Sequence, residues 1–179
     1  MYVDNRGRRD SLRRRIFGLG YPRHQPRRHA HNAGTLSGNF TAKGALTATT
    51  NLYLQTQESG PQSYTGTYNA TYDTPIALAD VARMWTSGSG ITPVSSITIG
   101  VDGAVQGTST GGQGACTFTG SFKPRATGKH LLDGTLAFSG STCSYGGKSM
   151  SVEATVISGQ MTIVGVTQQR DAAFFTSAQ

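Results

Sequence analysis

The chain has 179 residues, enough for one domain with a sizeable hydrophobic core, and its 14% charged residues are fewer than an ordinary soluble domain carries. The net charge of +7 comes entirely from residues 1–31, with nine arginines and two aspartates, whereas residues 32–179 are balanced. The basic pI is therefore no evidence that the rest of the chain binds a polyanion. The sequence also lacks an apolar stretch long enough to predict a transmembrane helix.

The first 34 residues have neither the helical nor the strand apolar period, and we expect them to form a disordered basic arm. Within the arm, Arg14 and Arg15 before Ile16 and Phe17 resemble the start of a twin-arginine export signal, although no apolar run follows. We favour an export signal scrambled by a misassigned start or frame slip. The alternative is a genuine arm, whose arginines would bind nucleic acid with a strong salt dependence.

From Thr35 onward, apolar residues alternate with polar ones between short turn signals, which is the pattern of β-strands. LTATTNLYL at 46–54 and YTGTYNATY at 64–72 each predict a strand. The second places Tyr64, Tyr68 and Tyr72 on one face, where they wall a core or line a cavity. Residues 74–85 are the one segment with helical content, a short turn before Trp85.

Residues 95–178 are predicted to form a series of hairpins. Asp102-Gly103 indicates a type I′ turn with positive φ at both residues, after a strand at 95–101 and before a return strand from Val105. Strands at 115–122 and 131–139 follow, then a hairpin turning at 158–160 and a closing strand at 172–177. On the two middle strands the inward positions are Cys116, Phe118, Gly120, Phe122, Leu132, Gly134, Leu136 and Phe138.

These elements predict an all-β fold of about 9–11 short antiparallel strands, in one domain over residues 35–179. Short sequential connections are typical of an up-and-down barrel or a meander-built sandwich. We favour the barrel because it leaves no exposed strand edges.

The two cysteines, Cys116 and Cys143, lie near the open ends of one hairpin if the strands at 115–122 and 131–139 pair. A disulfide between them would close a loop of about 27 residues and contribute about 3–4 kcal/mol. The alternative is two free buried thiols. A disulfide implies an oxidising compartment, which in a bacterium is the periplasm or the cell surface.

Residues 63–176 resemble a group of uncharacterised bacterial secreted proteins and lipoproteins. The resemblance is carried by IGVDG at 99–103, CTFTG at 116–120 and the second cysteine, Cys143. It implies a small calycin-like β-barrel behind an export signal and a lipid-attachment cysteine, with no established activity. This chain has no cysteine ahead of Cys116.

Titratable groups are sparse outside the arm, and we predict no catalytic site, no metal site and no cofactor. His130 with Asp133 is the alternative that would make the protein an enzyme. Lys123, Arg125 and Lys129 either contact an anion or lipid headgroup or belong to an ordinary polar hairpin loop.

The remaining candidate site is the interior of the barrel. An eight-to-ten-stranded barrel is either filled by side chains or holds one small ligand. The residues expected to form the core or line such a cavity are Trp85, Phe118, Phe122, Leu136 and Phe138. We therefore predict a non-catalytic cell-envelope barrel in the periplasm or on the bacterial surface, provided that a true export signal exists. Its role would be structural or the binding of a small apolar ligand or an envelope component, with nucleic acid as the less favoured partner.

Overall fold

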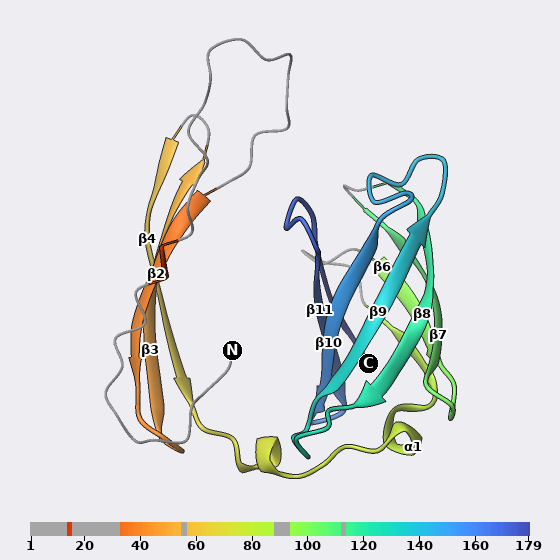
Figure 1. The fold of residues 1–179 in the computed structure, drawn as a ribbon, viewed down its shortest axis with the longest axis horizontal. Helices are drawn as coiled ribbons and strands as arrows, with labels where there is room; N and C mark the ends of the chain where they lie inside the picture. The colour runs from red at the N-terminus through yellow and green to blue at the C-terminus, as the bar shows by residue number, and fades with distance from the viewer. Residues whose placement is uncertain (1–13, 16–32, 55–56, 88–93, 112–113) are drawn as a thin grey trace. The chain divides into compact units, whose positions relative to one another are not determined.

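The computed structural model describes residues 14–15, 33–54, 57–87, 94–111 and 114–179 (Figure 1). Most of the basic arm predicted over residues 1–34 therefore lies outside the described residues. The chain divides into two compact units, residues 1–70 and residues 71–179. The all-β prediction is confirmed, but the strands lie in two separate sheets instead of one continuous barrel over residues 35–179.

The first unit contains an antiparallel meander of β2 (Ala33–Phe40), β3 (Ala45–Leu54) and β4 (Gln57–Thr67), with the two-residue β1 (Arg14–Arg15) paired to β2. Pairing of Phe40 with Leu46 and of Ala48 with Tyr64 puts these residues on one face of the sheet. Tyr64 is 52% exposed, so this face is not a closed core. The opposite face carries Thr, Ser and Asn side chains, as the period-two pattern predicts.

The strand predicted over residues 64–72 ends earlier than expected. β4 stops at Thr67, and a 3-10 helix, η1 (Ala70–Asp73), follows. The Thr74 backbone N–H donates to the Thr71 carbonyl at 3.0 Å, and the Thr74 hydroxyl donates to the same oxygen at 2.7 Å. These local bonds compete with strand pairing, so Tyr72 does not share a strand face with Tyr64.

The second unit is an eight-stranded antiparallel barrel with purely sequential connections, in the order β5 to β12. Its ends meet where Thr86 and Gln179 exchange two backbone hydrogen bonds of 2.9 and 3.0 Å. The barrel interpretation is therefore confirmed over the sandwich. Its strands are β5 (Met84–Thr86), β6 (Val94–Ile99), β7 (Ala104–Thr110), β8 (Cys116–Pro124), β9 (Leu132–Ser139), β10 (Ser149–Ile157), β11 (Gln160–Thr167) and β12 (Ala173–Ala178).

Large and small inward residues alternate around the barrel, which lets eight strands close tightly. Ile97 on β6 faces Gly107 on β7, which in turn faces Phe118 on β8. In the next row of paired residues, Gly120 on β8 pairs with Val105 on β7 and with Leu136 on β9. A residue without a side chain thus lies between two bulky ones.

Gly120 has no room for a side chain. A Cβ built at this position would lie 1.8 Å from the Thr135 carbonyl oxygen, which is backbone and cannot rotate away. We expect Gly120→Ala to lower the free energy of unfolding by about 1–3 kcal/mol because the sheet must open to admit the methyl group. Urea unfolding measures this loss. The control is Thr119→Ala at the exposed outward neighbour, and an equal effect of both variants would contradict the explanation.

The turn predicted at Asp102-Gly103 has a different geometry. Only Gly103 has positive φ (83°), and the Gly103 N–H donates to the Gly100 carbonyl at 2.9 Å. The turn is thus centred on Val101 and Asp102, followed by a left-handed glycine, which is the longer hairpin connection. Asp102 favours it because its Oδ1 accepts the Ala104 N–H at 3.0 Å.

One end of the barrel is covered by the segment that enters β5. It includes α1 (Leu78–Val81), confirming the predicted short helical turn, and Figure 1 shows α1 at that end. Val81 and Trp85 are 0% and 1% exposed, and the Trp85 indole Nε1–H donates to the Val81 carbonyl at 2.9 Å. The guanidinium of Arg83 lies 3.7 Å from the centroid of the Trp85 ring. The indole therefore closes this end of the core.

Candidate functional site

The barrel interior is filled by side chains. Phe118, Phe138 and Phe174 form a cluster with ring centroids 5.2–5.7 Å apart. The five residues predicted as core or cavity lining all belong to the buried hydrophobic core, with exposures of 0–3%: Trp85, Phe118, Phe122, Leu136 and Phe138. Close packing of this kind favours the core alternative over the ligand-lining one.

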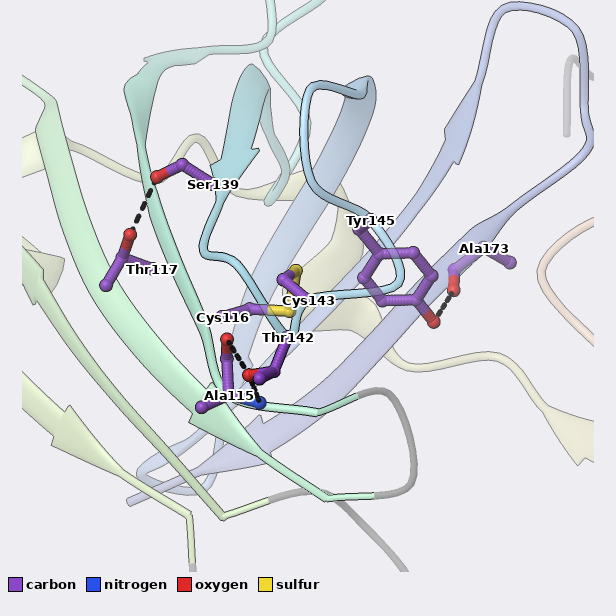
Figure 2. Close-up of a disulfide and its surroundings, with 8 residues drawn as sticks. All are labelled: Ala115, Cys116, Thr117, Ser139, Thr142, Cys143, Tyr145 and Ala173. Carbon is purple, nitrogen blue, oxygen red and sulfur yellow. Dashed lines mark hydrogen bonds between the residues drawn. A yellow bond between two sulfur atoms is a disulfide. The ribbon is translucent and has the colours of Figure 1, made fainter.

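The predicted disulfide is present and lies at the opposite end of the barrel. Cys116 at the start of β8 and Cys143 after β9 are bonded, with their Cα atoms 4.8 Å apart (Figure 2). Thr142 sits beside the bridge, and its hydroxyl accepts the Ala115 N–H at 3.3 Å. The disulfide thereby fixes the loop between β9 and β10, residues 140–148, which we call the strap.

The strap is also hydrogen-bonded to β12, on the side of the barrel away from β8. The Tyr145 hydroxyl donates to the Ala173 carbonyl at 2.8 Å (Figure 2). The Tyr145 ring meets the Phe138 ring edge-on, with the ring centroids 5.4 Å apart. Burial raises the pKa of the Tyr145 hydroxyl above its usual value. Because β8 and β12 are four strands apart, the strap spans the end of the barrel above the phenylalanine cluster.

A surface ion pair completes the attachment of the strap. Lys148 pairs with Asp171, whose other oxygen accepts the Thr167 hydroxyl at 2.6 Å. The hydrogen bond from Lys148, and secondly that from Thr167, lower the pKa of Asp171 from 3.8 to about 2. A carboxyl with a lowered folded-state pKa stabilises the fold above its unfolded pKa and loses that contribution as pH falls through the folded value.

We expect Asp171→Asn to reduce the melting temperature near neutral pH and to have progressively less effect between about pH 4 and pH 2. The reason is that acid protonates wild-type Asp171 and removes the same charge that the variant lacks. Thermal unfolding across this pH range is the measurement, and Lys148→Met should reproduce the behaviour of Asp171→Asn. If the melting temperatures of the wild type and of Asp171→Asn differ by the same amount at every pH down to 2, the lowered pKa of Asp171 does not have this origin.

His130 and Asp133 do not form the pair that an enzymatic site would need. The His130 Nδ1 lies 3.1 Å from the Thr74 carbonyl oxygen, and its Nε2 lies 3.0 Å from the Val156 carbonyl oxygen. Asp133 instead accepts hydrogen bonds from Arg125 at 2.5–3.3 Å. His130 thus joins the segment after η1 to β10, which is a structural role.

Two of the three cations considered as an anion site have acidic partners. Arg125 bridges Asp133 and Glu153 at 2.5 Å each, and the hydrogen bond that it donates to Asp133 is the largest cause that raises the pKa of Arg125 above its usual value. Lys129 pairs with Asp73 at 2.6 Å. Lys123 is exposed and makes no ion pair with a residue in the described part of the chain. The three residues therefore do not present a joint positive site.

A groove of about 850 Å³ lies on the outer wall of the barrel, across β8 to β12. Its floor is one row of paired residues, Gly134, Val152, Gly165 and Phe174, whose side chains point into the barrel or are absent. One wall is the next row of outward residues, in strand order Lys123, Asp133, Glu153, Val164 and Phe175. The other wall is Ser121, Thr135, Ser151, Val166 and Ala173.

The groove, which we call the outer groove, changes in character along its length. Hydroxyl and charged side chains line it over β8 to β10, and apolar side chains line it over β11 and β12. Val164, Val166 and Phe175 are 44%, 45% and 51% exposed, although the outer face of the barrel is otherwise rich in Ser and Thr. Apolar side chains grouped at the surface in this way are typical of binding sites.

The outer groove is not apparent in the sequence, because its walls are defined by strand register. A signal was present in the runs IVGV at 163–166 and AAFF at 172–175, where both faces of a strand are apolar. In a barrel whose outer face is exposed to solvent, such runs indicate an outward apolar surface that a ligand or partner covers.

Comparison with known protein families, with curated proteins and with solved structures gives no match to this chain. Within the described residues, no helix is both long and apolar enough to cross a bilayer, and no cluster of His, Cys, Asp and Glu residues could hold a metal ion.

Proposed function

We propose that this protein is an exported, non-catalytic β-barrel of the bacterial cell envelope, and that it acts by binding at its outer surface. The observation that carries this proposal is the Cys116–Cys143 disulfide, which uses both cysteines of the chain. Such bridges form and persist in oxidising compartments. The disulfide therefore supports placement in the periplasm or at the cell surface.

The packed interior supports binding on the outside of the barrel over binding within it. A small apolar ligand inside the barrel would have to displace the Phe118, Phe138 and Phe174 rings, which are in contact with one another. The outer groove already offers polar groups beside exposed apolar ones. The engagement of His130 and of the Asp133 carboxylate in structural contacts supports a role without catalysis.

Location and thiol state can be tested together in cells of the source organism. We expect the protein to be recovered in the envelope fraction. After acid quenching and denaturation, its cysteines should resist alkylation until a reductant is added. A Cys143→Ser variant is the control, because its remaining cysteine should be alkylated without reductant. Recovery of the wild-type protein in the cytosol with both thiols free would refute the proposal.

A further inference from the structure

The shape of the outer groove selects the kind of ligand that it can hold. Its walls follow five neighbouring strands, and at about 4.8 Å per strand they extend for about 19 Å. The two walls are two residues apart along each strand, a separation of about 7 Å. These dimensions suit a slender linear chain that crosses the strands and do not suit the rounded surface of a globular partner.

The charges around the outer groove cancel. Lys123 and Arg125 contribute two positive charges, Asp133 and Glu153 contribute two negative ones, and Arg125 is bonded to both carboxylates. An ionic ligand therefore gains no net attraction from these four residues. The groove is matched to a ligand without net charge.

The polar half of the outer groove can both donate and accept hydrogen bonds. The carboxylate of Glu153, 48% exposed, accepts, Lys123 donates, and the hydroxyls of Thr135 and Ser151 on the facing wall do both. An acyl chain would desolvate these groups without replacing their hydrogen bonds, which is costly. A ligand that carries many hydroxyl groups would satisfy them.

The apolar half of the outer groove supplies the complementary feature. Phe175 is cross-strand partner to Val164, and its ring is half exposed at the end of the groove. Sugar rings present hydroxyl groups around their edge and C–H groups on their faces, and those faces pack against aromatic side chains. We propose that the outer groove binds a neutral linear oligosaccharide, with C–H faces against Phe175 and hydroxyls toward Glu153 and Thr135.

This inference rests on the proposed function, because an exported envelope protein meets glycans. The test is titration of the full ¹⁵N-labelled chain with neutral hexasaccharides, namely cellohexaose, chitohexaose and maltohexaose. At least one should shift amide resonances of residues 133–135, 151–153, 164–166 and 173–175 in a saturable manner. Phe175→Ala should weaken that binding by about ten-fold or more, as expected for an aromatic anchor.

Ile157→Ala is the matched control, because Ile157 is also an exposed apolar residue of the barrel, 43% exposed, but does not line the outer groove. Its affinity for the sugar should equal that of the wild type. Absence of saturable shifts with all three hexasaccharides would overturn the inference, as would shifts produced only by decanoate or by an uncharged extended decapeptide. An envelope location without sugar binding would refute this inference alone, whereas a cytosolic location would refute the proposed function.

Discussion

Replacing both cysteines, Cys116→Ser with Cys143→Ser, should lower the free energy of unfolding by about 3.5 kcal/mol, the chain-entropy value for a loop of this size. The bridge joins residues 27 apart in sequence. For a barrel unit of this length the melting temperature should fall by on the order of 10–20 °C. Denaturant unfolding of oxidised wild type and double variant, monitored by far-UV circular dichroism, measures the difference.

In the double variant, local opening of the structure should increase most in the strap. The strap keeps its Tyr145 and Lys148 contacts in the double variant but loses its covalent tie to β8, so amide exchange should accelerate most over residues 140–148. The reduced wild type is the matched control and should behave like the double variant. A stability loss below about 1 kcal/mol, or exchange that accelerates uniformly over the barrel, would contradict this assignment.

Phe118→Ala should cost about 3–5 kcal/mol, the usual range for truncating a buried aromatic ring. The ring contacts Phe138 and Phe174 and covers Gly107, a neighbour with no side chain to fill the space left behind. Urea unfolding measures the loss. Phe175→Ala is the matched control, because the same residue type at 51% exposure should lose less than about 1 kcal/mol.

The cavity left by Phe118→Ala gives a second readout. A dry apolar cavity of this kind binds benzene, so saturating benzene should raise the melting temperature of the variant through mass action. The wild type, with its interior filled, should not respond. Equal responses of both proteins would mean that the wild-type barrel already contains an apolar cavity.

The fold could be predicted from the sequence wherever local pattern determines structure. Alternation at Phe118 and Phe122 or at Leu136 and Phe138 identifies inward positions directly, and burial of all four confirms it. Prediction failed where local hydrogen bonding overrides the pattern, as in η1, where the Thr74 hydroxyl bonds to the Thr71 carbonyl in a segment that the pattern predicts to continue the strand. It also failed at Asp102, where a side-chain bond to the backbone selects a different turn.

The separation of the meander from the barrel could not be predicted, because the strands of both have the same alternating pattern. What distinguishes them is cross-strand pairing, which depends on long-range register. The same holds for the groove: Glu153 and Val164 become neighbours only through pairing of β10 with β11. Likewise, the charge of Arg125 is apparent in the sequence, but its neutralisation by two acids from different strands is not.

We propose that this barrel binds ligands at its outer wall and not in its filled interior. Methyl-labelled full chain titrated with decanoate and with the hexasaccharides tests it directly. Inward methyl groups of Leu132, Leu136 and Ile163 should keep their chemical shifts with every ligand, and outward methyl groups of Val164 and Val166 should respond to an oligosaccharide. Saturable shifts of the inward methyl groups would contradict the account, because they would show a ligand inside the barrel.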